Sequence, residues 1–113
     1  MFLFNKKNSL KNKKDIENLF KNGKSCSHMF LRTMYLPGES FLKTGVSVPK
    51  KLIPLAVKRN LIKRRIKEQI RLLPENLLEK KQGLLFILFH GKKEVSSKEI
   101  YECLKILFSK TFH

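Results

Sequence analysis

Apolar residues along this chain recur at the spacings of helices and strands, and the first such group predicts a short helix. Ile16, Leu19 and Phe20 share one face at positions i, i+3 and i+4, which indicates a helix over residues 13–22. Gly23 follows at once and is a natural helix stop. We expect Leu19 to lie in the core, whereas Phe20 suits either the core or an exposed binding surface.

The longest helical pattern follows Pro54, a residue that suits a first helical turn because its missing N–H leaves no bond unmade there. At 100° per residue, the apolar positions fall within about a third of the circumference: Leu55, Ile62, Ile66, Ile70 and Leu73. Pro74 ends this helix or lies just past its end. The pattern therefore predicts a helix from Leu55 to Leu73 with one dry face.

Three segments between the helices have the composition of strands. Residues 27–36 and 41–49 flank the turn sequence Pro-Gly-Glu-Ser at 37–40, so we expect two strands that run antiparallel across it. Gly45 leaves room there for a close neighbour or a bulge. Residues 83–91 hold a continuous apolar run, which indicates a strand buried on both faces.

A last helix is expected after Ser96 and Glu99, which have the spacing of a capping box. Its core side carries Ile100, Cys103, Leu104, Leu107 and Phe108. The order of elements predicts an α+β fold in which helices pack on a small sheet. At 113 residues the chain is one domain, which we expect at residues 11–113 after a basic, mobile segment at residues 1–10.

Composition decides the class of partner. The net charge is +16 and the isoelectric point is near 10.2, which favours polyanions: nucleic acid first and an anionic membrane surface second. The first four residues are too short for a signal peptide, and the apolar run Leu84–Phe89 is too short to cross a bilayer. We therefore expect a cytoplasmic protein.

The positive charge is concentrated around the second helix, where residues 49–73 hold nine Lys or Arg and a single acid, Glu68. The side opposite the dry face carries Asn60, Lys63, Arg64, Lys67 and Arg71. Like charges spaced i,i+4, such as Lys63 and Lys67, destabilise a helix by a few tenths of a kcal/mol. An anionic partner would relieve that repulsion, so this face predicts a nucleic-acid contact rather than a merely solvated surface.

The same stretch resembles a known family. The segment AVKRNLIKRRIKE at residues 56–68 is similar to the arginine-rich signature of the bacterial ribonuclease P protein subunit, and GVSVPKK at Gly45–Lys51 resembles the strand before it. The similarity covers about Leu10 to Lys110, nearly the whole chain. Leu61 stands where that family usually has its second signature arginine. The resemblance implies a four-stranded mixed sheet packed by three helices, with the fourth strand obtained by splitting residues 27–49.

The resemblance also implies a function. In ribonuclease P the RNA component is the catalyst and uses bound Mg²⁺ to remove the 5′ leader of precursor tRNA. The protein would be an accessory subunit that holds the catalytic RNA and the leader, with no organic cofactor. For contact with RNA, the resemblance implies Lys50, Lys51, Lys58, Arg59, Asn60, Lys63, Arg64 and Lys67. We add Arg71 because it lies on the same charged face. Ile16 and Phe20 would lie in the leader groove, where the family often has two aromatics.

The chain offers no constellation for chemistry of its own. A protein nuclease needs a metal cluster or an acid–base pair. The three histidines, His28, His90 and His113, share no spacing, and Cys26 and Cys103 have no metal-ligand neighbour. We expect no catalytic and no metal-binding residue in the protein, and we expect any Mg²⁺ to be bound mainly by the RNA.

Three other classes of protein could carry this charge. A ribosomal or other structural RNA-binding protein would have the charge without the signature. A DNA-binding helix-turn-helix would need a short helix before the basic one, where two strands are predicted instead. A membrane-surface helix would have no need of the strand at Leu84–Phe89. The sequence therefore favours a ribonuclease P subunit, with a structural RNA-binding protein as the alternative.

Overall fold

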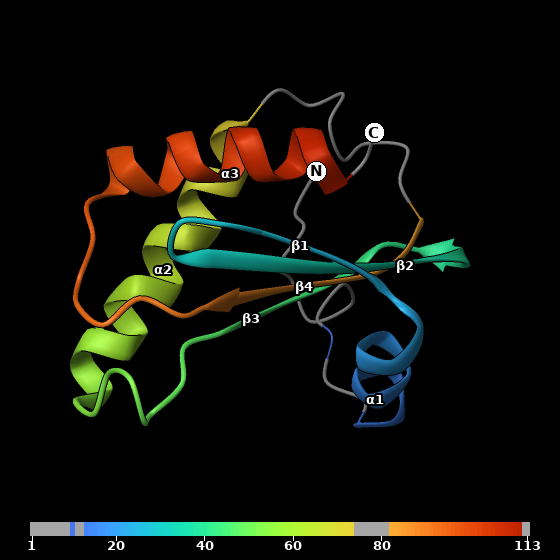
Figure 1. Ribbon diagram of the computed structural model, residues 1–113, viewed down its shortest axis with the longest axis horizontal. Helices are drawn as coiled ribbons and strands as arrows, with labels where there is room; N and C mark the ends of the chain where they lie inside the picture. The colour runs from blue at the N-terminus through green and yellow to red at the C-terminus, as the bar shows by residue number, and fades with distance from the viewer. Residues whose placement is uncertain (1–9, 11–12, 74–81, 112–113) are drawn as a thin grey trace.

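The computed structural model describes Leu10, residues 13–73 and residues 82–111. In chain order the elements are α1 (Lys13–Asn22), β1 (Lys24–His28), β2 (Leu31–Phe41), β3 (Lys43–Ser47), α2 (Ala56–Leu72), β4 (Gln82–Phe89) and α3 (Ser97–Thr111) (Figure 1). The predicted α+β class is confirmed, as three helices pack on a four-stranded mixed sheet. Residues 1–9 and the connection at 74–81 lie outside the described residues.

The sheet has the strand order β1-β2-β4-β3. Strand β2 pairs antiparallel with β1 and with β4, while β3 pairs parallel with β4. The segments on either side of residues 37–40 run in opposite directions, as expected, but they do not pair with each other across a turn, because β4 lies between them. Its continuous apolar sequence suits that central position, since both of its faces are covered.

The turns of the first strands also differ from the prediction. Chain reversal occurs at Met29 and Phe30, where Met29 has a φ of 52° and His28 pairs with Leu31. Strand β2 then continues through Pro37, which pairs with Gly83 before the register shifts. A proline fits at such an irregular end of a strand ladder because no regular backbone donor is required there.

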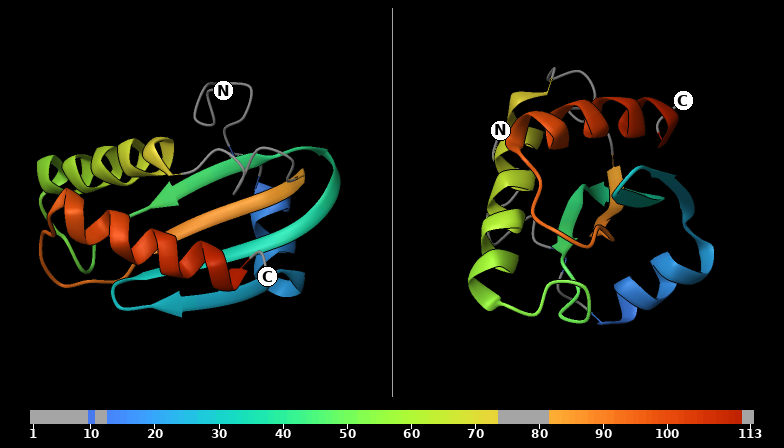
Figure 2. Two further views of the ribbon diagram at one scale, coloured as in Figure 1. Left: turned by 90° about the horizontal axis from the view of Figure 1, so that it is seen from above. Right: turned by 60° about the vertical axis from the view of Figure 1, so that its left-hand side comes forward.

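Helices cover both faces of the sheet, as the views in Figures 1 and 2 show. Helices α2 and α3 lie on one face and enclose the main core, which contains Ile62, Ile66, Ile70, Leu85, Ile87 and Phe89 among its buried side chains. Helix α1 lies on the other face above a smaller cluster formed by Leu10, Leu19, Met34 and Phe86. Leu19 and Cys103 are both buried, as expected.

The dry face of α2 is confirmed except at its first residue. Ile62, Ile66, Ile70 and Leu73 are buried, whereas Leu55 is 60% exposed. Leu55 is the N-cap and has extended backbone angles, so the helix begins at Ala56 and Pro54 precedes the first turn. The periodicity argument failed at Leu55 because it treated this residue as already helical.

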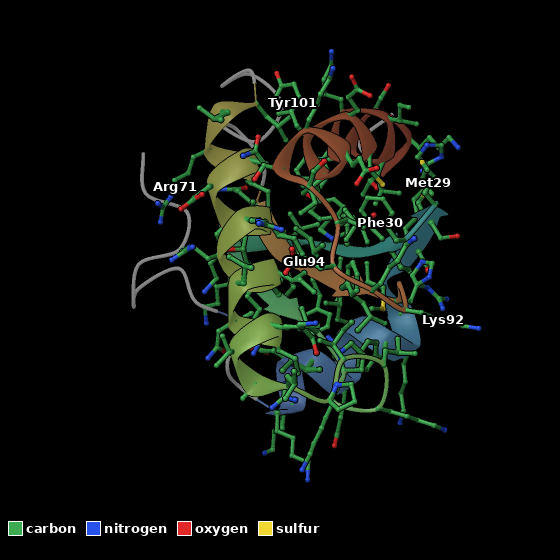
Figure 3. All side chains as sticks on the ribbon, turned by 90° about the vertical axis from the view of Figure 1, so that its left-hand side faces the viewer. Met29, Phe30, Arg71, Lys92, Glu94 and Tyr101 are labelled. Carbon is green, nitrogen blue, oxygen red and sulfur yellow. The ribbon has the colours of Figure 1, made fainter. Side chains whose placement is uncertain are left out.

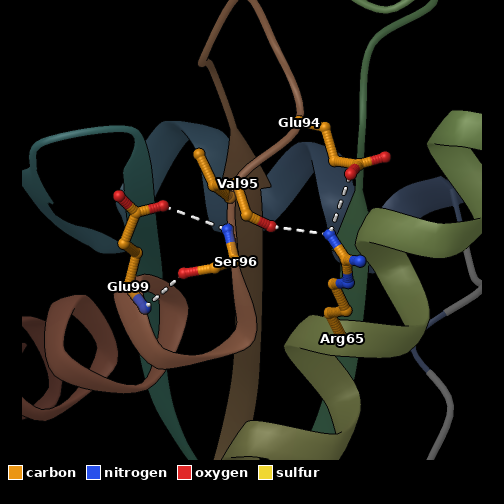
Figure 4. A network of polar contacts seen from close by, with 5 residues as sticks. All are labelled: Arg65, Glu94, Val95, Ser96 and Glu99. Atoms are coloured by element: carbon orange, nitrogen blue, oxygen red, sulfur yellow. Dashed lines mark hydrogen bonds and ion pairs between the residues drawn. The ribbon is translucent and has the colours of Figure 1, made fainter.

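Hydrogen bonds fasten Leu10 to the sheet and cap the start of α3. The Leu10 N–H donates to the Thr44 carbonyl at 2.8 Å, and the Leu10 side chain packs in the smaller core although the sequence placed this residue in a mobile segment. At the start of α3 the predicted capping box is present. The Ser96 N–H donates to Glu99 Oε2 at 3.0 Å, and the Glu99 N–H donates to Ser96 Oγ at 3.2 Å (Figure 4).

Candidate nucleic-acid interface

A shallow groove runs along the solvent-facing side of α2. Its volume is about 440 Å³, and it is lined by Asn60, Lys63, Arg64, Lys67, Glu68 and Arg71. Five of these six residues are the polar row predicted from the sequence, and they meet because offsets of three, four, seven and eleven residues fall on one side of a helix. Figure 3 shows Arg71 pointing outward from α2.

The charge in this groove is unbalanced. Glu68 is the only acid that lines it, and Glu68 Oε1 lies 3.9 Å from Arg64 Nε. Both side chains are mostly exposed, so the pair contributes about 0–1 kcal/mol and opens easily. Four cations therefore face one carboxylate, and an Arg64 guanidinium could exchange that carboxylate for a phosphate with matching fork geometry.

Arg59 belongs to the arginine-rich signature, but its side chain forms hydrogen bonds with the protein's own backbone. Its Nη1 donates to the Ile53 carbonyl at 3.0 Å and to the Pro54 carbonyl at 2.7 Å. These bonds fasten the loop between β3 and α2 to the first turn of the helix. Arg59 is therefore separated from the groove residues and has a structural task that the sequence pattern did not indicate.

The other predicted RNA-binding lysines lie outside the groove. Lys58 is exposed on another flank of α2 and lines a second pocket at the start of this helix. Lys50 is exposed in the loop after β3, and so is Lys51. The structure thus brings five of the nine predicted residues together and distributes the remaining four around the start of α2.

Arg65 is an important residue that the sequence reasoning missed. Its Nη1 donates to the Val95 carbonyl at 2.8 Å and lies 3.4 Å from Glu94 Oε2 (Figure 4). Only 25% of its side chain is exposed. Arg65 therefore fastens the loop between β4 and α3 to α2. No local signal could reveal this, because its partners are about thirty residues away along the chain.

The predicted leader surface lies on the opposite face of the sheet, beside α1. Phe20 is 54% exposed, so it is not a core residue, while Ile16 is half-buried. The Phe20 ring meets the Phe86 ring edge to face, with the ring centroids 5.8 Å apart and the planes at 84°. An exposed aromatic supported by a buried one is a platform on which a base can stack.

The sheet beneath this platform is apolar and closely packed. A Cβ on Gly45 would lie only 3.0 Å from Cδ1 of Phe86, so glycine at this position lets the Phe86 ring approach β3 closely. Leu84 and Leu88 are half-buried on the same face of β4. Arg32 pairs with Leu88 in the sheet, and its Nε donates to Ser25 Oγ at 2.7 Å. The positive charge of Arg32 therefore lies beside the apolar surface that Leu84 and Leu88 form.

Groups suited to catalysis are not gathered in the described part of the chain. Burial raises the pKa of the Cys103 thiol, opposed by backbone hydrogen bonds, so this thiol is a poor nucleophile at neutral pH. Residues 13–73 and 82–111 contain no group of three His, Cys, Asp or Glu side chains placed to hold a metal ion. Within the same residues, no helix is long and apolar enough to cross a bilayer.

Comparison with known proteins gives one consistent family. The family model described as Ribonuclease P matches residues 4–111. The chain is 31% identical over 109 residues to the ribonuclease P protein component of Clostridioides difficile, covering 96% of this chain and 95% of that protein. It is 34% identical over 108 residues to the protein of the same name from Bacillus velezensis, covering 94% and 90%.

Solved structures with this fold agree. The Staphylococcus aureus RNase P protein superposes with a TM-score of 0.78 at 23% identity, covering 94% of this chain and 98% of that one. The Thermotoga maritima RNase P protein gives a TM-score of 0.75 at 22% identity, covering 90% and 96%. With the sequence matches spanning nearly its whole length, this chain belongs to the ribonuclease P protein component family.

Proposed function

We propose that this protein component of ribonuclease P binds the catalytic RNA along α2 and holds the 5′ leader of precursor tRNA against α1 and the sheet, in the cytoplasm. The observation that carries the proposal is the groove on α2, where four cations and Asn60 face solvent with a single acid. Family membership supports the subunit role, so the alternative of a structural RNA-binding protein without a part in tRNA maturation is not favoured.

The α2 groove suits the phosphate backbone of a folded RNA. Arg64 and Arg71 offer planar forks that can bind two phosphate oxygens, and Lys63 acts as a compact point charge. The rigid helix fixes the spacing of these cations, so little backbone conformational entropy is lost when they bind. Asn60 adds a side chain that can both donate and accept a hydrogen bond.

The surface beside α1 suits a single strand without regard to its sequence. Stacking of a base on an aromatic ring contributes about 1–3 kcal/mol and tolerates any base. Phe20 provides that ring, while the aliphatic side chain of Ile16 can pack but not stack. Arg32, which lies beside Leu88 on the same face, would attract the strand's phosphates.

The chemistry itself is assigned to the RNA. Mg²⁺, when bound, would activate the attacking water, and the described residues of the protein do not group into a cluster that could hold it. The protein's contribution is electrostatic. Its cations neutralise phosphates near the cleavage site, which lowers the repulsion between the catalytic RNA and its substrate, so that less Mg²⁺ is needed to bring the two RNAs together.

Salt dependence of RNA binding tests this proposal. Affinity for the catalytic RNA should fall steeply with salt, because each neutralised phosphate contributes roughly 0.7–0.9 to the slope of log K against log salt concentration. Arg64→Ala should lower both the affinity and the slope by about one contact. Lys110→Ala, which removes an exposed charge in the last turn of α3, is the matched control. Equal effects of the two substitutions would refute the α2 interface.

A further inference from the structure

A second pocket lies at the start of α2, between the loop that precedes α2 and the loop that precedes α3. Its volume is about 330 Å³, and it is lined by Leu52, Ile53, Pro54, Leu55, Lys58, Lys92, Lys93 and Glu94. Neither the α2 groove nor the surface beside α1 shares a residue with it. The pocket is therefore a separate surface from the two proposed RNA contacts.

Both walls of this pocket are fastened to α2 by arginines. Arg59 binds the carbonyls of Ile53 and Pro54, which form one wall. Arg65 binds the Val95 carbonyl and contacts the Glu94 carboxylate, which holds the other wall (Figure 4). Two arginines of the basic helix thus help to fix the shape of both loops.

The lining combines apolar side chains with a positive rim. Leu55 is 60% exposed and Pro54 is also exposed, so apolar surface faces solvent here. Lys58, Lys92 and Lys93 supply three positive charges, and the one acid, Glu94, is already paired with Arg65. Figure 3 shows Lys92 extending away from α2, which carries the positive rim outward along the loop.

We propose that this pocket holds one unstacked nucleotide of the catalytic RNA, with its base packed on Pro54 and Leu55 and its flanking phosphates bound by Lys58, Lys92 and Lys93. Proteins recognise RNA mainly through such unstacked bases in loops and bulges. A volume at the lower end of the range of about 300–1,000 Å³ for ligand pockets suits one nucleotide rather than a peptide segment. The excess of positive charge from the three lysines favours a polyanionic ligand.

The position of the pocket favours the catalytic RNA over the leader. In Figure 1, α1 lies at one end of the sheet, and the two loops that form the pocket lie at the other end. Lys58 and Asn60 lie within one turn of α2 but on different flanks, so an RNA that wraps around the start of α2 can reach both surfaces. This inference rests on the proposed function, because it assigns a second contact to the same RNA.

The test compares two double variants of the full protein in binding to the catalytic RNA. Lys92→Ala with Lys93→Ala should lower the log–log salt slope by at least one contact, roughly 0.7–0.9. Lys105→Ala with Lys110→Ala, which removes the same charge from exposed positions of α3, should leave the slope nearly unchanged. Equal losses in the two double variants would overturn the proposal, because they would reflect net charge alone.

A third variant tests the apolar floor separately. Leu55→Ala should weaken binding by roughly three- to tenfold at an unchanged salt slope, since it removes apolar contact and no charge. Its thermal stability should match the wild type because Leu55 is largely exposed. Wild-type affinity in this variant would overturn the proposal, and so would a loss seen only with leader-bearing precursor tRNA. A wild-type protein that fails to bind the catalytic RNA would refute the proposed function itself.

Discussion

Individual arginines of the basic helix have different tasks although the sequence presents them as one signature. Arg64 is exposed in the α2 groove, whereas Arg59 and Arg65 are fastened to loop carbonyls. Phe20 and Leu55 show the same ambiguity among apolar residues, because each has a helical spacing that suits the core but an exposed side chain.

Phe20 is the residue whose substitution tests the leader surface. Phe20→Ala should weaken binding of leader-bearing precursor tRNA by the holoenzyme far more than binding of mature tRNA, by up to the roughly 10- to 100-fold that one stacked base contributes. Ile16→Phe should leave this preference unchanged or raise it, since it adds a ring one turn away. The measurement is the pair of holoenzyme affinities for each variant.

Equal losses for precursor and mature tRNA would contradict the leader surface. Because Phe20 is more than half exposed, the Phe20→Ala protein should remain folded, and a circular dichroism melt provides the control. A melted protein would mean that the contact of Phe20 with Phe86 is needed for the fold, and the loss of affinity would then say nothing in favour of the leader surface.

Cys103 gives the stability of the fold a defined pH dependence. Burial raises the pKa of its thiol above the usual value of 9.0, so the folded state favours the protonated form. This preference adds to the free energy of unfolding. The added stability is fully present below the pKa that the thiol has in the unfolded chain, and it is lost as the pH rises through the higher pKa of the thiol in the folded protein. Burial also raises the pKa of Tyr35 above its usual 10.0, which acts in the same direction at still higher pH.

Denaturant unfolding measured between pH 7 and pH 11 checks this dependence. The free energy of unfolding should decline from about pH 9 upward in the wild type. Cys103→Ala should begin from a lower stability, because it leaves a cavity, but should decline less steeply over the first part of this range. An identical pH profile in the two proteins would show that the Cys103 thiol does not ionise on unfolding.

Helices and strands differed in how much of them could be predicted. The bounds of α1 and the capping box of α3 follow from residues within a few positions of each other, and both were confirmed. The pairing of β3 with β4 could not be derived in this way, because these strands are far apart in the sequence. It depends on β4, the most apolar strand, taking a central place in the sheet. The charged face of α2 was predictable from local periodicity, whereas the loops fastened by Arg59 and Arg65 were not.

Arg65 links two elements, so its removal should act on stability rather than on the α2 groove. Hydrogen bonds from a charged group contribute about 1.5–3 kcal/mol, and Arg65→Ala should lower the free energy of unfolding by an amount near the lower end of that range. Arg64→Ala, on the exposed side of the same helix, should change it by no more than about 0.5 kcal/mol. Urea titrations of both variants provide the comparison. Equal stabilities would mean that the Arg65 bonds add nothing to the fold.

At the scale of the whole molecule, the sheet separates surfaces with different proposed tasks. Helix α2 and the loops at its start present cations for the catalytic RNA, and α1 on the opposite face presents an aromatic platform for the leader (Figures 1 and 2). Such an arrangement would let one small protein hold two RNA segments at once. Its net charge of +16 would provide the attraction that brings both of them together.

The most direct test of this account is the rate of precursor tRNA cleavage at low Mg²⁺ concentration, measured for the catalytic RNA with and without the protein. We predict cleavage by the complex where the RNA alone is nearly inactive, since protein cations replace part of the counterion charge that Mg²⁺ otherwise supplies. Higher Mg²⁺ should narrow this difference. A protein that gave no stimulation at any Mg²⁺ concentration would contradict the account, and so would cleavage by the protein alone after nuclease treatment had destroyed any RNA.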